Sequence, residues 1–321
     1  MKILVTGMGG ELGTRVAQLL EQRAWATEIV GVDFVPPRRR LRRAEFRRID
    51  PRDRDKLVRF VTDVAPNVVA HFGVYEPSSR MTPESAVERT ELATVAALSA
   101  AARAGNLEYV VVRSGLEVYG PRSASVSVPD EDALPAPRTP YGESLLEVEA
   151  IAAGLRVQHG VGVCALRYAP VLGSHVPSPL GRLLRLPVVP VPAFADPPFS
   201  VLHPDDAADA MVAAIERRFD GPLNIVGPGA ATPWQAVRLG GRIPIPVLPG
   251  LWGPAAQAVE LAGAAIAEHV VELLRHGRTG AGSRAVDALG LTNLRPTQDV
   301  LRELFDWADV VPLQMVRGEV A

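Results

Sequence analysis

Met1-Lys-Ile-Leu-Val-Thr-Gly-Met-Gly-Gly-Glu-Leu-Gly13 opens the chain, and an apolar-periodic stretch then leads to Ile29-Val-Gly-Val-Asp33. The run from Ile3 to Val5 has the composition of a short buried strand. Glycines at 7, 10 and 13 then recur every third residue into a segment whose apolar residues have helical spacing. This order predicts a strand, a tight turn, a helix and a second strand.

A glycine-rich turn before a helix is typical of a dinucleotide site. Glycines permit tight dihedral angles and leave room for a diphosphate against backbone N–H groups, where the helix dipole favours negative charge. Asp33 ends the second apolar run, where a carboxylate accepts hydrogen bonds from an adenosine ribose. The alternative is a glycine-rich loop that only caps a helix. A carboxylate repels a 2'-phosphate, so NAD is favoured over NADP. The basic run 36–43 is either a solvated loop or a contact for such a phosphate.

Composition limits the possible classes of protein. The chain has 321 residues, of which 47% are hydrophobic, and a net charge of −2. It is long enough for a large core, and it has no overall attraction to nucleic acid. The single cysteine, Cys164, lies in an apolar run and is expected to be a buried core residue. Met1 leads directly into a core strand with no signal-peptide pattern, which favours a cytoplasmic location.

Alternating strands and helices predict a doubly wound parallel sheet of about seven strands. We expect a dinucleotide-binding domain over 1–173, with sheet elements that return near 200–226, and an interleaved smaller substrate lobe over 174–321. Prolines cluster between 177 and 198 and again between 238 and 249, which indicates loops.

The most apolar segment, 249–274, is interrupted by Pro254, Glu260 and Glu268, so it is not a membrane span. The segment is a helix packed in the lobe, a dimer contact or an interfacial amphipathic helix.

Further blocks of sequence resemble the NAD-dependent epimerase/dehydratase family of extended short-chain dehydrogenase/reductases. The resemblance covers about residues 1–230 and includes the glycine-rich turn. The other matching blocks are Phe46-Arg-Arg-Ile-Asp50, His71-Phe-Gly73, Glu117-Val-Tyr-Gly120, Pro140-Tyr-Gly-Glu-Ser144, Leu166-Arg-Tyr168 and His203-Pro-Asp-Asp206.

The resemblance implies a Rossmann-type fold, an NAD cofactor and a small-molecule substrate of the nucleotide-sugar kind. It also implies a homodimer through helices near 85–104 and 141–155. Tyr141 matches the family's general acid/base. The cofactor contacts that it implies are Gly7, Gly10, Glu11, Leu12, Gly13, Asp33, Phe34, Asp50, Phe72, Gly73, Val74 and Tyr141.

The chain departs from the family pattern at the chemical centre. The family has a Lys four residues after the Tyr, which lowers the pKa of the phenol, and a Ser or Thr that orients the substrate. Position 145 is Leu and position 115 is Gly, while Ser114 is expected to point to the opposite face of its strand. Arg113, Arg138 or Arg167 is the cation that remains available to replace the Lys.

Other polar residues have structural interpretations. His71 and His203 are expected to have core or capping roles, and Asp205 and Asp206 are expected to cap the helix that begins there. No cluster has metal-ligand spacing, so we predict no metal.

Two functional hypotheses follow. The first is an NAD-dependent epimerase, dehydratase or reductase, an oxidoreductase or isomerase with an altered Tyr site, acting on a nucleotide-linked sugar or another hydroxylated metabolite. The second is a catalytically inactive dinucleotide-binding protein that acts as a sensor or as a partner of another enzyme.

Overall fold

A seven-stranded parallel sheet forms the centre of the larger part of the protein. The computed structural model describes residues 1–78, 81–121, 128–261 and 266–309. The strand order is β3-β2-β1-β4-β5-β6-β8, which confirms the predicted doubly wound sheet. The strands are β1 (Lys2–Thr6), β2 (Glu28–Asp33), β3 (Glu45–Arg48), β4 (Val68–His71), β5 (Tyr109–Gly115), β6 (Gly162–Tyr168) and β8 (Gly221–Ile225).

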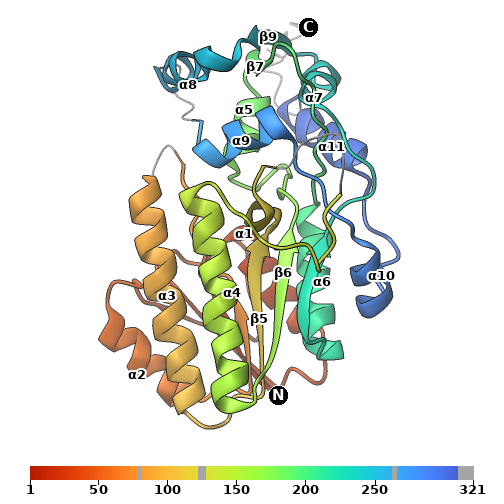
Figure 1. Cartoon of the computed structure of the whole chain (residues 1–321). Helices are drawn as coiled ribbons and strands as arrows, with labels where there is room; N and C mark the ends of the chain where they lie inside the picture. Colours follow the sequence, from red (N-terminus) through yellow and green to blue (C-terminus); the bar gives the residue numbers. More distant parts are fainter. Residues whose placement is uncertain (79–80, 122–127, 262–265, 310–321) are drawn as a thin grey trace, which may run out of the picture.

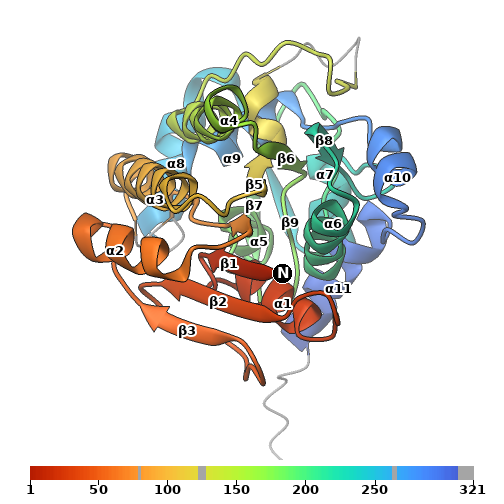
Figure 2. The ribbon, with the colours of Figure 1, turned by 90° about the horizontal axis from the view of Figure 1, so that it is seen from below.

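Helices cover both faces of this sheet, as Figure 2 shows. One face carries α2 (Arg54–Val64), α3 (Pro83–Arg103) and α4 (Pro140–His159), and the other carries α1 (Glu11–Leu20) and α6 (Pro204–Arg217). Because both faces are covered, the central strands are apolar along most of their length rather than alternating. Cys164 on β6 is fully buried among them, as predicted.

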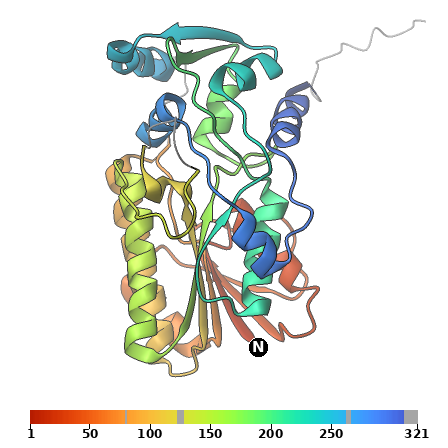
Figure 3. The same ribbon diagram turned by 45° about the vertical axis from the view of Figure 1, so that its right-hand side comes forward.

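A smaller lobe with its own apolar core lies over the carboxyl ends of the strands (Figures 1 and 3). In parallel α/β sheets this is the edge at which ligands bind. The lobe contains α5 (Pro179–Leu184), β7 (Val188–Pro192), α7 (Pro233–Leu239), β9 (Ile243–Val247), α8 (Trp252–Leu261), α9 (Glu268–His276) and α11 (Thr297–Asp309). The helix α10 (Ser283–Leu289) instead packs beside α6 and β8 on the larger part.

The proline-rich stretches are more regular than the sequence predicted. They contain α5 and the strands β7 and β9, which pair in parallel from Val188↔Ile243 to Pro192↔Val247. Proline is tolerated at the first position of a helix, and it is tolerated in edge strands because the missing N–H faces outward. Both strands of a two-stranded sheet are edge strands, so the expectation of loops was wrong here. The edge strand β3 was also not predicted.

The apolar segment 249–274 forms the short 3₁₀ helix Pro249–Leu251 and most of α8 and α9. The buried side chain of Trp252 belongs to the core of the lobe, which is one of the expected roles. Among the residues that the structure describes, no helix is both long and apolar enough to cross a membrane.

Candidate functional site

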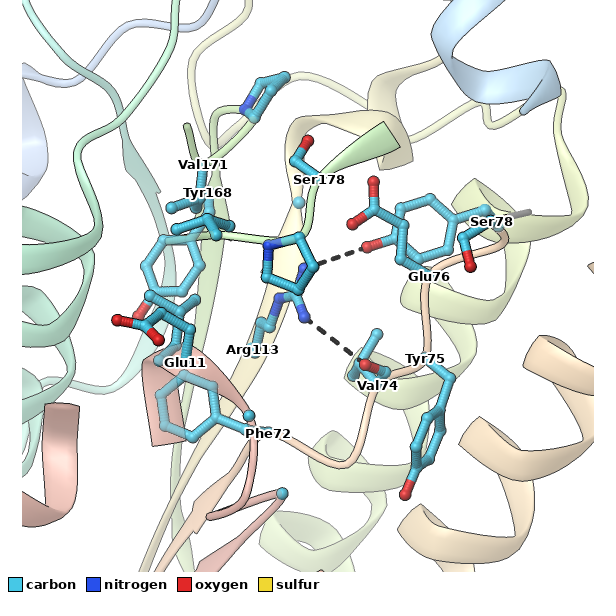
Figure 4. Close-up of a pocket in the computed structure, with 18 of the residues that line it drawn as sticks. Glu11, Phe72, Val74, Tyr75, Glu76, Ser78, Arg113, Tyr168, Val171 and Ser178 are labelled. Atoms are coloured by element: carbon cyan, nitrogen blue, oxygen red, sulfur yellow. Dashed lines mark hydrogen bonds between the residues drawn. The ribbon is translucent and has the colours of Figure 1, made fainter. Parts of the chain in front are cut away.

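A cavity of about 350 Å³ lies at the carboxyl edge of the sheet, between the two parts of the protein. Its wall begins at the glycine-rich turn after β1 and reaches Tyr141 at the start of α4. Figure 4 shows side chains from both parts pointing into it, with Arg113 between Glu76 and Tyr168. The volume falls in the range of small-molecule and cofactor sites.

The glycine-rich turn leaves the start of α1 open. Gly10 is the N-cap residue, and no side chain caps the helix. A Cβ on Gly13 would lie 2.2 Å from the carbonyl oxygen of Gly7, and Gly7 itself has a φ of +69°. Only glycine permits this close packing of the helix on the turn. The uncapped N–H groups and the helix dipole therefore form a site that fits a diphosphate.

Asp33 places its carboxylate beside this turn. The side chain is buried, and its two oxygens accept hydrogen bonds from the backbone N–H of Gly9 (3.0 Å) and of Phe34 (2.7 Å). Burial raises the pKa of Asp33, and these backbone N–H groups oppose the rise. A carboxylate held in this way fits the hydroxyl groups of an adenosine ribose.

Aromatic side chains lie next to Asp33. The rings of Phe34 and Tyr75 are 5.9 Å apart, and the guanidinium of Arg89 lies 5.3 Å from the centre of the Phe34 ring. Phe34 and Tyr75 both line the cavity. A flat aromatic group such as adenine fits between side chains of this kind.

Glu11, in the first turn of α1, is buried and paired with two arginines. Its carboxylate accepts from Arg15 at 2.8 Å and from Arg39 at 3.0 Å. These cations offset a negative charge that would otherwise repel a diphosphate. One arginine of the basic run is thus tied to a protein carboxylate, whereas Arg38 lines the cavity.

Two residues of the predicted cofactor set are not among those that line the cavity. Asp50 pairs with Arg52 at 2.7 Å, and this hydrogen bond lowers the pKa of Asp50 to about 2. Gly73 packs against the side chains of His71 and Ala93. The other predicted residues all contribute to the wall, namely Gly7, Gly10, Glu11, Leu12, Gly13, Asp33, Phe34, Phe72, Val74 and Tyr141.

Tyr141 lies at the other end of the cavity, where Arg113 approaches its hydroxyl group. The Nη2 of Arg113 donates to the Tyr141 hydroxyl over 3.4 Å, and Nη1 donates to the carbonyl of Val74 over 3.5 Å. Burial raises the pKa of Tyr141, and the positive charge of Arg113 opposes the rise. Of the three arginines considered from the sequence, Arg113 is therefore the one that contacts the phenol.

The two departures from the family pattern lie side by side. A Cβ on Gly115 would lie 2.2 Å from Oε2 of Glu117 and 3.2 Å from Cδ1 of Leu145, which is fully buried. A serine at 115 would therefore displace the Glu117 carboxylate. The Ser114 hydroxyl donates to Glu149 at 2.5 Å instead.

The smaller lobe adds polar side chains that sequence reasoning missed. The ring of His269 of α9 packs against that of Tyr141 in a tilted arrangement, with ring centres 4.7 Å apart, and its Nε2 lies 3.1 Å from Glu76. Arg278 is buried and pairs with Glu117 at 2.9 Å and with Glu272 at 2.6 Å. No motif marks these residues, because they reach the cavity only when the lobe folds over the sheet.

His71 has the core role expected of it. The Thr94 hydroxyl donates to the carbonyl of Thr90 at 2.7 Å, so it accepts from Nε2 of His71 at 3.0 Å. Nδ1 then accepts from the Thr6 hydroxyl at 2.8 Å. Complete burial lowers the pKa of His71 to about 4, which keeps the imidazole neutral.

His203 is the N-cap of α6, and its side chain accepts from the backbone N–H of Asp205. The expectation that Asp205 and Asp206 cap this helix was wrong, because Pro204 occupies the first helical position and moves the cap to residue 203. Both aspartates lie in the first turn, where their charge is favourable to the helix dipole.

Comparison with known proteins agrees with this geometry. The family model described as "NAD dependent epimerase/dehydratase family" matches residues 3–226. An uncharacterized protein of Mycobacterium tuberculosis is 29% identical over 255 residues, covering 76% of this chain and 67% of the relative. A UDP-glucose 4-epimerase of Lactobacillus helveticus is 26% identical over 186 residues, covering 57% of this chain and 55% of that protein.

Solved structures share the fold over almost the whole chain. A UDP-glucose 4-epimerase of Thermotoga maritima with UDP-glucose has a TM-score of 0.74 at 19% identity, covering 97% of this chain and 99% of that one. A UDP-glucuronic acid 4-epimerase of Bacillus cereus in complex with UDP-glucuronic acid and NAD has a TM-score of 0.74 at 22% identity, with the same coverage.

The match of the family model extends over most of the chain, from β1 to the end of β8. It includes the glycine-rich turn, Asp33 and Tyr141, and it confirms NAD as the cofactor. The chain belongs to the NAD dependent epimerase/dehydratase family.

Proposed function

We propose that the protein is an NAD-dependent oxidoreductase of the epimerase/dehydratase type that acts on a nucleotide-linked sugar. One observation carries this proposal: a single cavity is lined by the glycine-rich turn, by Asp33 and by the phenol of Tyr141. A cofactor held at the turn and a substrate hydroxyl held at the phenol would then share one enclosed space, as hydride transfer requires.

The residues of the chain have separate tasks in this proposal. Bound NAD⁺ supplies the acceptor for the hydride that leaves the substrate carbon. Tyr141, as the phenolate, would accept the proton of the substrate hydroxyl as the alcohol is oxidised to a ketone. The start of α1 binds the diphosphate, and Asp33 orients the ribose.

The similar proteins support a nucleotide-sugar substrate. The solved relatives carry UDP-glucose or UDP-glucuronic acid, according to their descriptions. The proposed substrate would reach Tyr141 past the side chains of the smaller lobe. A homodimer through α3 and α4 remains a prediction, as does the cytoplasmic location.

The experiment uses the purified full chain. Calorimetry first measures NAD binding. After UDP-glucose or UDP-glucuronic acid is added, the absorbance of reduced nicotinamide and the conversion of the sugar nucleotide are both followed, because an epimerase returns the hydride to the sugar and leaves no net reduced cofactor. We expect NAD to bind and one of these sugar nucleotides to reduce it or to be converted. Tyr141→Phe should leave NAD affinity within about twofold and slow that reaction by a factor of about 10² to 10⁴, the usual contribution of a general acid/base.

A catalytically inactive dinucleotide-binding protein is the second candidate. The buried Leu145 and the carboxylate of Glu117 beside Gly115 favour it, because they occupy the region where the family has its Lys and its Ser or Thr. Tight NAD binding with neither reduction of the cofactor nor conversion of either sugar nucleotide would support this candidate and overturn the first one.

A further inference from the structure

The phenol of Tyr141 needs a nearby cation before it can act as a base near neutral pH. A free tyrosine titrates near pH 10, and burial raises the pKa of Tyr141 further. The residue one helical turn later, Leu145, is fully buried and carries no charge. Any stabilisation of the phenolate must therefore come from outside α4.

Two arginines act electrostatically on the Tyr141 hydroxyl, namely Arg113 and Arg278. Arg278 directs its terminal nitrogens to the carboxylates of Glu117 and Glu272. Its positive charge is therefore already balanced by buried negative charge, and little of it remains for the phenol.

Arg113 differs from Arg278 in what it contacts. Within the described part of the chain, its hydrogen bonds reach uncharged acceptors, the hydroxyl of Tyr141 and the carbonyl of Val74, whereas Glu76 and Glu117 act on it through space. The Val74 carbonyl fixes one end of the guanidinium group, which leaves the other end directed at the phenol. Arg113 comes from β5, so the cation reaches Tyr141 from the sheet rather than from the helix that carries the tyrosine.

We propose that Arg113 is the positioning residue that stabilises the phenolate of Tyr141, in place of a cation on α4. Its catalytic meaning rests on the proposed function, but the contact itself can be tested without a substrate. A guanidinium stays protonated throughout the working pH range, so it acts by charge and hydrogen bonding and does not pass a proton on.

Other charged and titratable groups face the same phenol. Glu76, from the loop after β4, and Glu117 oppose ionisation of Tyr141, whereas Arg278 favours it. His269 of α9 packs on the ring of Tyr141, and Tyr168 of β6 lies within electrostatic reach of Arg113. Of the two arginines that favour ionisation, Arg113 has the larger effect, and its guanidinium is the one that contacts the Tyr141 hydroxyl.

The test compares Arg113→Gln with a matched control, Arg167→Gln. Arg167 is a buried arginine that likewise donates to a tyrosine hydroxyl, that of Tyr119 at 2.9 Å, but it does not line the cavity. Each protein is loaded with NAD and titrated with base while its ultraviolet absorbance is recorded. The same titration of that protein carrying Tyr141→Phe is subtracted, and the difference reports the ionisation of Tyr141.

We expect Arg113→Gln to move the ionisation of Tyr141 upward by about one to three pH units, the usual effect of an opposite charge at this distance. Arg167→Gln should move it by less than about half a unit. Arg113→Lys should restore most of the wild-type value, since it restores the charge. Adding Leu145→Lys to the Arg113→Gln protein should also lower the pH at which Tyr141 ionises.

Equal shifts in Arg113→Gln and Arg167→Gln would overturn the inference, as would a Tyr141 that does not ionise in the wild-type protein before the fold is lost. If Arg113→Gln does not fold, the inference would be overturned instead by an Arg113→Lys protein in which Tyr141 ionises at a pH far above that of the wild type. Absence of turnover would overturn the proposed function, but the titration would still decide the role of Arg113.

Discussion

The two ends of the cavity are built in different ways. The cofactor end is made largely from consecutive residues near the start of the chain, and its ligand groups are backbone N–H groups and one carboxylate. The reacting end combines side chains from β5, α4, the loop after β4 and α9. A backbone site can be recognised in a sequence, whereas a site made of converging side chains depends on how distant elements meet.

The two ends also differ in how they hold charge. At the cofactor end, Glu11 is balanced by Arg15 and Arg39, and Asp33 by backbone N–H groups that include that of Gly9, all within the first 39 residues. At the reacting end, Arg278 is balanced by carboxylates that include one from the other part of the protein, Glu117. A substitution of a charged residue at the cofactor end should therefore have only local effects. A substitution at the reacting end should also affect the packing of the smaller lobe.

The largest effect is expected from Gly13→Ala at the cofactor end. The added Cβ would lie 2.2 Å from the Gly7 carbonyl oxygen, so the helix must move off the turn. We expect NAD affinity, measured by calorimetry, to fall at least a thousandfold, or about 4 kcal/mol. Gly154→Ala in α4 is the matched control, because a Cβ there meets nothing within 4 Å.

That control should keep wild-type NAD affinity and gain roughly 0.5–1 kcal/mol of stability, since glycine is unfavourable inside helices. If Gly13→Ala bound NAD as tightly as Gly154→Ala, the comparison of the two ends would fail at its first step, because close backbone packing would not define the cofactor end.

The next effect concerns His71 beneath the glycine-rich turn. Burial lowers the pKa of His71 to about 4, below the ordinary value near 6.5. Between these values the unfolded chain binds the proton and the folded protein does not, so stability is full above pH 6.5 and declines as the pH falls towards 4. We expect a loss of about 3 kcal/mol in the free energy of unfolding over this window, measured by urea denaturation.

His71→Gln supplies the control for this measurement, because an amide does not titrate. The variant is expected to be less stable at every pH but to lose most of the decline between pH 6.5 and 4. An unchanged decline in His71→Gln would assign the pH dependence to other groups.

The smallest effect is expected from Asp33→Asn. An amide keeps the size of the side chain but is a weaker acceptor for ribose hydroxyl groups than a carboxylate. We expect NAD affinity to fall about tenfold, or about 1.4 kcal/mol, while the melting temperature changes little. Asp63→Asn, on the exposed face of α2, should bind NAD like the wild type. If both variants bound equally well, Asp33 would have no part in cofactor binding.

The sequence predicted the fold better than it predicted the reacting end. The strand periodicity, the glycine spacing and Asp33 all reflect local backbone geometry, and the doubly wound sheet was confirmed. The strands β7 and β9 were missed because their prolines indicate loops unless an edge position is known. The capping role expected for His203 was confirmed, but the cap was also assigned to Asp205 and Asp206, which was wrong, because aspartate is the more usual capping residue.

By itself, the sequence determined the parallel sheet, the turn that fits a diphosphate and the absence of a cation at position 145. Only the tertiary structure decided which arginine approaches Tyr141, and that Glu76, Glu117, His269 and Arg278 surround it. The physical reason is the range of the interactions involved. Strand and helix patterns arise between residues a few positions apart, whereas these contacts join elements that meet only after the smaller lobe has packed against the sheet.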